Sequence, residues 1–161
     1  MMRALCVFAC ATGLACAAEQ PVLVGQGQGQ SYDWGTDQVF VKVTAGQTGG
    51  RLTLVEDHLK PGFVLPRHHH EKMTEVFTVL AGEVEFTCGD RKLVARAGST
   101  LTIPPGVRHA VSCPHGATLL TTFAPGGFDV YLAACAALTP AQAKDASSMK
   151  QLSEKFDIHD D

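Results

Sequence analysis

Eight short runs of β-branched, aromatic and aliphatic residues follow one another along the chain, and glycine, proline or aspartate separates most of them. The runs occupy residues 39–44, 51–58, 75–80, 83–88, 92–96, 99–103, 109–113 and 117–123. Many short strands at this spacing are typical of an antiparallel β-sandwich or barrel. The sequence therefore predicts an all-β fold over residues 39–124.

Glycine-rich stretches mark the breaks between these runs. Residues 25–30 alternate glycine with glutamine, which cannot bury apolar surface, so we expect residues 19–38 to be a flexible lead-in. The Ala81-Gly82 pair predicts a tight hairpin between two runs, and Cys88-Gly89-Asp90 predicts the next one.

Beyond residue 124 the apolar period changes from that of a strand to that of a helix. Three apolar residues fall at helical spacing, a Thr-Pro cap signal follows, and a serine cap signal precedes a second apolar stripe. In chain order these residues are Phe128, Leu132 and Cys135; Thr139, Pro140 and Gln142; Ser148 and Gln151; and Met149, Leu152 and Phe156. We therefore predict a helical extension over residues 125–161, packed on the outside of the barrel.

The first eighteen residues have a different character from the rest. Arg3 carries the only charge, the following residues are small, apolar or weakly polar, and Ala18 ends a segment suited to cleavage. This pattern predicts a secretory signal peptide over residues 1–18 and an exported protein, periplasmic or secreted. A buried N-terminal helix is the alternative. A lipoprotein signal at Cys16 ranks below cleavage, because Gly13 stands where a large aliphatic residue is usual.

Length and charge limit the classes of protein that remain. A chain of 161 residues with 45% hydrophobic and 18% charged residues is typical of one globular domain. The formal net charge is −3 and no run is rich in lysine or arginine, so nucleic acid and anionic membranes are poor candidate partners. Three cysteines follow the leader, an odd number that leaves at least one thiol unpaired: Cys88, Cys113 and Cys135.

Four side chains of metal-binding type occur at spacings that bring them together on strands. On an extended strand His68 and His70 point to one face, and His69 points away. Glu75 begins the next run, and a Pro-Pro-Gly turn at residues 104–106 precedes His109. Three imidazoles and one carboxylate suit Fe, Mn, Ni, Cu or Zn and leave two positions of an octahedral ion free. The alternative is an exposed histidine run with an unrelated barrel histidine.

The same residues resemble the two motifs of the cupin superfamily, which are small antiparallel β-barrels of the jelly-roll type. Nine of the ten fixed motif positions are matched at the family's spacing: Gly62, His68, His70, Glu75, Gly82, Gly98, Pro104, Gly106 and His109. Cys113 stands where the family usually has asparagine. The resemblance covers roughly residues 39–124. It implies a jelly-roll barrel with short C-terminal helices, and the ligand set His68, His70, Glu75 and His109.

Two flanking segments, 46–50 and 125–128, are similar to single-domain cupins of the quercetin 2,3-dioxygenase-like type. This resemblance implies a dioxygenase-type oxidoreductase with one divalent transition metal, Fe or Mn first and Ni, Cu or Zn next. It implies a small enolic or phenolic substrate, with Glu75 accepting the substrate's hydroxyl proton. It also implies a homodimer in which residues 32–43 pack on or exchange with the partner. The expected apolar pocket comprises Phe77, Val79, Val84, Phe86, Leu101, Ile103 and Val111.

Two other functions stay open at this stage. The same metal could serve an oxygen-independent isomerase, decarboxylase or lyase, which needs a further acid or base in the pocket. The sequence nominates Glu56 and His58 for that role. The third function is a non-catalytic barrel that binds a small ligand. Cys113 shares a face with His109, so it could line the pocket, although a small buried hydrophobe is the commoner use of a free cysteine.

Overall fold

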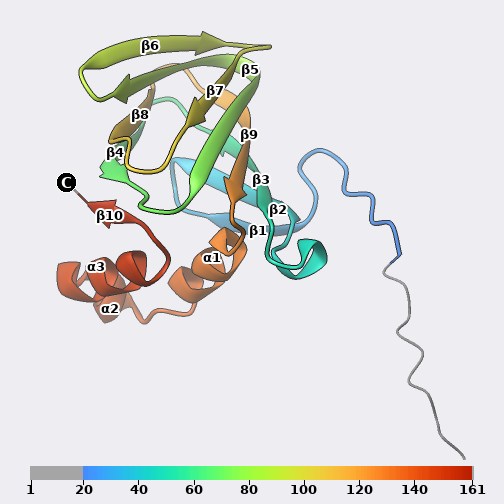
Figure 1. The fold of residues 1–161 in the computed structure, drawn as a ribbon, viewed down its shortest axis with the longest axis vertical. Helices are drawn as coiled ribbons and strands as arrows, with labels where there is room; N and C mark the ends of the chain where they lie inside the picture. The colour runs from blue at the N-terminus through green and yellow to red at the C-terminus, as the bar shows by residue number, and fades with distance from the viewer. Residues whose placement is uncertain (1–19, 161) are drawn as a thin grey trace, which may run out of the picture.

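Two antiparallel sheets that share one long strand make up most of the molecule (Figure 1). The computed structural model describes residues 20–160, so the predicted leader lies outside the described residues. The strands are β1 (Gln30–Asp33), β2 (Asp37–Val43), β3 (Thr53–Leu59), β4 (Phe63–His69), β5 (Thr74–Cys88), β6 (Arg91–Arg96), β7 (Thr100–Ile103), β8 (His109–Cys113), β9 (Ala117–Ala124) and β10 (His159–Asp160). The helices are η1 (Gly46–Thr48), α1 (Phe128–Ala136), α2 (Pro140–Lys144) and α3 (Ala146–Lys155).

The strand order is that of an open, barrel-like jelly roll. The first sheet runs β1-β2-β3-β9-β5-β7, and the second runs β10-β4-β8-β5-β6. The first part of β5 pairs with β9 and β7, whereas the second part pairs with β8 and β6. Each of the eight predicted runs overlaps a strand, so the predicted all-β jelly-roll class is confirmed.

The predicted hairpin at Ala81-Gly82 is wrong, because β5 continues through it. The strand bends there and passes from one sheet to the other, with a register shift between Val79 and Ala81. Gly82 has φ +81°, and a Cβ at this position would lie 2.4 Å from the carbonyl oxygen of Gly116. Only glycine fits such a bend without strain. The hairpin at Gly89-Asp90 is confirmed, since Cys88 pairs with Arg91.

The expected flexible lead-in, residues 19–38, contains an additional strand. β1 pairs antiparallel with β2 over its whole length. The segment before β1 also contacts the barrel, because the amide of Gly27 donates to a carboxylate oxygen of Glu56 at 2.9 Å and Lys42 bonds the carbonyl of Gly25. The strand was missed because its sequence, Gln-Ser-Tyr-Asp, is polar and lies at the sheet edge.

The C-terminal extension is helical over most of its length, as predicted, and lies at one end of the sandwich (Figure 1). The capping box of Thr139 and Gln142 is confirmed at the start of α2. The predicted cap at Ser148 is wrong: Asp145 caps α3 and accepts a hydrogen bond from the Ser148 amide. After α3 the chain returns to the second sheet as β10, which pairs with β4. No helix within residues 20–160 has the length and apolar character needed to cross a membrane.

Candidate metal centre and its cavity

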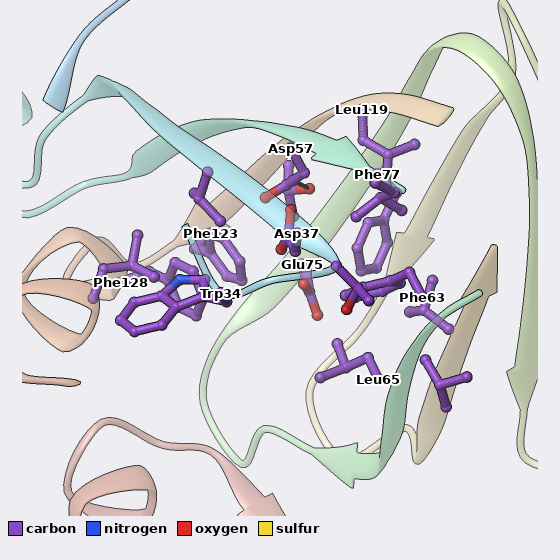
Figure 2. Close-up of a pocket in the computed structure, with 17 residues that line it drawn as sticks. Trp34, Asp37, Asp57, Phe63, Leu65, Glu75, Phe77, Leu119, Phe123 and Phe128 are labelled. Carbon is purple, nitrogen blue, oxygen red and sulfur yellow. Dashed lines mark hydrogen bonds between the residues drawn. The ribbon is translucent and has the colours of Figure 1, made fainter. Parts of the chain in front are cut away.

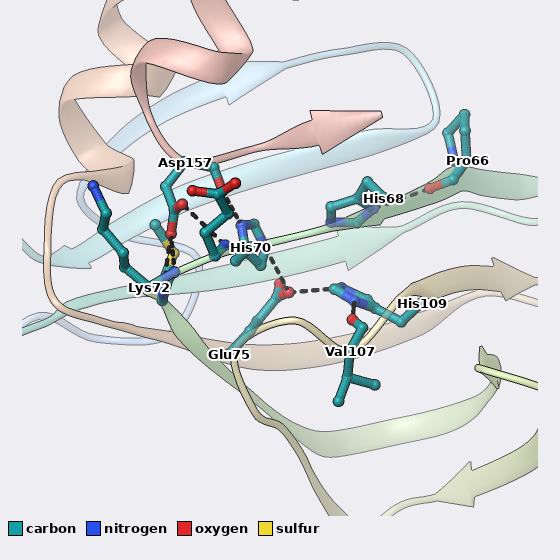
Figure 3. Close-up of polar contacts among 10 residues, drawn as sticks. Pro66, His68, His70, Lys72, Glu75, Val107, His109 and Asp157 are labelled. Carbon is teal, nitrogen blue, oxygen red and sulfur yellow. Dashed lines mark hydrogen bonds and ion pairs between the residues drawn. The ribbon is translucent and has the colours of Figure 1, made fainter. Parts of the chain in front are cut away.

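The four predicted ligands converge on one point between the two sheets (Figure 3). His68 lies on β4 directly opposite His109 at the start of β8, and Glu75 lies near the start of β5. His70 follows the end of β4. All four side chains are buried, and one ligand atom from each lies within 4.8 Å of the others. This group could hold a metal ion, and its members are those that the strand spacing and the cupin resemblance predicted.

A backbone carbonyl orients each imidazole in the group. The Nδ1 atoms lie close to the carbonyl oxygens of Pro66 (3.0 Å, His68), Asp157 (2.7 Å, His70) and Val107 (3.1 Å, His109). A carbonyl can only accept, so each Nδ1 carries the proton, and Nε2 is the atom that each ring turns toward the centre. Such outer partners fix the ring orientation of metal-binding histidines.

The charges in the group favour metal binding. Burial works against a charged Glu75, but close contact with the Nε2 atoms of His109 at 2.9 Å and His70 at 3.3 Å outweighs it and lowers the pKa of Glu75 to about 2. Burial lowers the pKa of His68, which favours the neutral imidazole that a metal requires. For His70 burial also acts to lower the pKa, but contact with Glu75 reverses the sign and raises it. A carboxylate and three imidazoles suit first-row transition metals.

Asp157, which the sequence did not single out, connects the C-terminal segment to the ligand group (Figure 3). Its carbonyl orients His70, and its carboxylate accepts hydrogen bonds from the amides of Glu71, Lys72 and Met73 at 3.0, 2.9 and 2.8 Å. Asp157 has φ +64°, and within residues 20–160 it is the one residue other than glycine with positive φ. The loop between two ligands, His70 and Glu75, is therefore held by a residue more than 80 positions away.

An apolar cavity of about 300 Å³ lies beside Glu75 (Figure 2). A second cavity of about 170 Å³ reaches His68 and His70, and the two share Leu65, Glu75, Phe123 and Phe128. We call the first of these the main cavity. Its apolar lining includes Phe63, Leu65, Phe77, Val111, Leu119, Phe123, Phe128 and Leu132. The ligand group thus faces a space suited to a small hydrophobic molecule.

The predicted pocket lining was correct only for Phe77 and Val111. The other predicted members, Val79, Val84, Phe86, Leu101 and Ile103, belong instead to the packed core or lie against it. They were assigned to the pocket because alternation identifies the inward face of a strand, but it does not say how far along that face the cavity extends. Most of the remaining lining comes from the β1–β2 connection, β2, β3, β4, β9 and α1, which the sequence did not connect with the pocket.

The main cavity also has polar groups that the sequence reading missed. Asp37 and Asp57 line it from neighbouring strands, together with Thr121, whose hydroxyl donates to Asp57 at 2.5 Å. Burial raises the pKa of Asp37 to about 6 and raises that of Asp57 well above its usual range. One buried side-chain oxygen within residues 20–160 has no hydrogen-bond partner, and it is Oδ1 of Asp37.

The nominated acid and base, Glu56 and His58, do not line this cavity. They flank Asp57 on β3, so alternation directs them to the opposite face. There Glu56 bonds His58 at 2.6 Å and Lys42 at 2.9 Å. The nomination was therefore wrong by one position along β3, since the residue that lines the cavity is Asp57. The pattern of buried residues 53, 55, 57 and 59 would have identified Asp57 as the inward carboxyl.

We expect an Asp37→Asn variant to melt at a higher temperature than the unsubstituted protein above about pH 6. The folded-state pKa of Asp37 is raised from 3.8 to about 6, so ionisation in this range weakens the folded state. Below about pH 4 both folded and unfolded states bind the proton, and the gain should disappear. Melting curves followed by circular dichroism from about pH 4 to about pH 8 test this. A pH-independent difference would contradict it.

Cys113, the one departure from the motif, lies outside the ligand group. Its side chain is fully buried in the core, and its sulfur lies 3.5 Å from the carbonyl oxygen of Glu83. Burial raises the pKa of its thiol. Cys113 thus acts as a small buried hydrophobe. Within residues 20–160 all three cysteines are free, and Cys88 and Cys135 are half-buried.

Comparison with known proteins identifies the same fold. The family model described as "Cupin domain" matches residues 55–126. KdgF from Halomonas sp. superposes with a TM-score of 0.60 at 17% identity, over 68% of this chain and 99% of that one. An RmlC-like cupin from Shewanella frigidimarina superposes with a TM-score of 0.55 at 25% identity, over 69% of this chain and 97% of that one.

A third solved structure, a predicted oxalate decarboxylase from Thermotoga maritima, gives a TM-score of 0.53 at 17% identity, over 55% of this chain and 80% of that one. None of the curated proteins matches this sequence. These likenesses extend over most of each compared chain and establish the architecture.

Proposed function

Because the chain belongs to the cupin superfamily, we propose that it is a metal-dependent oxidoreductase of the dioxygenase type that acts on a small enolic or phenolic molecule. One observation carries this proposal: three imidazoles and one carboxylate form a buried group, and the carboxylate, Glu75, lines an apolar cavity of about 300 Å³. A purely structural barrel would have no need to gather four buried metal-binding side chains beside such a cavity.

The residues of the chain divide the work between holding the metal and holding the substrate. His68, His70, Glu75 and His109 would hold one divalent ion, iron or manganese first and nickel, copper or zinc next, which supplies Lewis-acid and redox chemistry when bound. Phe63, Phe77 and Phe123 pack on the apolar body of the substrate and exclude water. The charged carboxylate of Glu75 borders the cavity and accepts the hydroxyl proton of an enol or phenol.

Elemental analysis of the chain from residue 19 onward, followed by oxygen-uptake assays with flavonols, catechols and β-diketones, tests the proposal. We expect about one transition-metal ion per chain and oxygen uptake that a chelator abolishes. If the native metal is zinc and no oxygen is consumed, the dioxygenase proposal fails and the oxygen-independent isomerase, decarboxylase or lyase is favoured instead. Failure to bind any of these metals after reconstitution would overturn the metalloenzyme proposal and leave a small-ligand-binding barrel.

The second candidate function is an oxygen-independent isomerase, decarboxylase or lyase. One observation favours it: two carboxyl groups, Asp37 and Asp57, line the same cavity as Glu75 without being members of the ligand group. They provide the additional acid and base that this class of reaction needs.

We also propose that the mature protein is exported and forms a homodimer. The predicted signal peptide supports export. The position of β1 at the edge of the first sheet supports a partner packed against residues 32–43, since an edge strand presents unpaired backbone groups. Cell fractionation and light scattering of the purified mature chain test the two statements separately.

A further inference from the structure

A diagonal row of polar side chains crosses the inner face of the first sheet. Asp57 on β3 lies opposite Val39, two residues along β2 from Asp37. On the other side of Asp57, Thr121 on β9 donates a hydrogen bond to it. The row ends at Glu75 on β5, which lies opposite Phe123, two residues along β9 from Thr121. Polar groups therefore step from strand to strand toward the ligand group.

Figure 2 shows the carboxyl groups of Asp37, Asp57 and Glu75 in the centre of the main cavity, between two sets of aromatic side chains. Asp57 is only 8% exposed. Among the described residues no lysine or arginine lines the cavity, and His58, which lies outside it, offsets only part of the effect of burial on the pKa of Asp37. Buried carboxyl groups without a paired cation cost stability, and titratable groups perturbed in this way cluster at functional sites.

The two aspartates differ in a way that assigns them different roles. Asp57 is the more deeply buried, and its neighbours Asp37 and Glu75 add negative charge, so the neutral acid is favoured at this position. Asp37 lies at the start of β2, is only half-buried, and has a carboxyl oxygen without a partner. A neutral acid and a carboxylate side by side in an apolar cavity are what general acid–base catalysis requires.

We propose that Asp37 and Asp57 form a proton-transfer pair that interconverts the keto and enol forms of a substrate with an apolar body, such as an aromatic α-hydroxyketone. This inference rests on the proposed function for the class of substrate, but the reaction itself needs no oxygen. It adds a second activity to that proposed for the ligand group. The main cavity then has the ligand Glu75 at one place and the Asp37–Asp57 pair at another.

The step balances without a further reactant. The carboxylate of Asp37 takes a proton from the carbon next to the carbonyl, and the C–H electron pair becomes the enol C=C bond. The carbonyl π pair moves to oxygen, which receives the proton of Asp57. Return of a proton from Asp37 to carbon, with the hydroxyl proton going back to Asp57, regenerates the pair. When the proton returns instead to the former carbonyl carbon of a hydroxyketone, the other hydroxyl gives its proton to Asp57 and becomes the carbonyl, so that the two groups exchange places.

The test is deuterium exchange at the methylene group of 2-hydroxyacetophenone, followed by proton NMR in D₂O without oxygen. The unsubstituted metal-loaded protein should exchange this group faster than buffer does. Asp57→Asn and Asp37→Asn should each slow the enzymatic exchange by about 100-fold or more, the usual contribution of one acid or base. Glu56→Gln is the matched control, because it removes a buried carboxylate from the opposite face of β3 and should leave the rate unchanged.

Either aspartate variant suffices if the other fails to fold, since both members of the pair are needed. Equal exchange rates in the unsubstituted protein and in a folded variant would overturn the proposal. So would a metal-loaded protein that exchanges no faster than buffer. Metal content and oxygen uptake, measured on the same samples, report on the proposed function independently, so a protein that binds metal and consumes oxygen without exchange fails only the present inference.

Discussion

A His109→Ala variant is expected to lose stoichiometric metal binding. His109 is fully buried, lies opposite His68 across the β4–β8 ladder, and contacts Glu75 at 2.9 Å. Its removal takes away one of four donors and leaves the buried carboxylate of Glu75 with one imidazole partner in place of two. Loss of an outer partner alone typically weakens metal affinity by about 10–100-fold, and loss of a direct ligand should exceed that.

The measurement is competition with a chromogenic chelator for zinc or manganese, alongside elemental analysis. His115→Ala is the matched control, because His115 is exposed and lies outside the ligand group, yet the substitution also removes one imidazole. Glu75→Gln separates charge from shape, since it keeps the size of the side chain and removes its negative charge. Unchanged stoichiometry and affinity in both His109→Ala and Glu75→Gln would show that the metal binds elsewhere.

An Asp157→Gly variant should bind the metal about 10–100-fold more weakly than the unsubstituted protein, as expected for an outer partner. Glycine adopts the positive φ of this position freely, so the substitution removes the carboxylate and leaves the backbone turn accessible. The three amides of residues 71–73 then lose their common acceptor, and the loop that joins His70 to Glu75 is held less firmly.

Two comparisons make this experiment specific. Asp157→Asn keeps a side-chain carbonyl oxygen that can accept from one or two of the amides. Its metal affinity should therefore fall between those of the unsubstituted protein and Asp157→Gly. Asp145→Asn alters the cap of α3, in the same C-terminal segment but away from the ligands, and should leave the affinity unchanged. A metal affinity of Asp157→Gly equal to that of the unsubstituted protein would mean that the Asp157 carboxylate does not help to hold the ligand loop.

The ligand group was predictable because two members lie close together on or beside one strand and the other two stand at the spacing of the cupin motifs. Strand alternation directs His68 and His70 to one face, and the motif spacing adds Glu75 and His109 before any tertiary contact is known. The same alternation assigned Glu56 and His58 wrongly. The register of β3 is decided by which face meets the core, and the buried face carries Asp57.

The sequence by itself determined the class of fold, the positions of most strands, the capping box of α2 and, through the motif resemblance, the four side chains that could hold a metal. Each depends on periodicity or on the spacing of residues along the chain. Tertiary structure alone decided that β5 bends at Gly82 and passes between sheets, that Asp157 returns to orient His70, and that Asp37 and Asp57 meet in the cavity. These features join residues distant in sequence, and only the packing of the sheets brings such residues into contact.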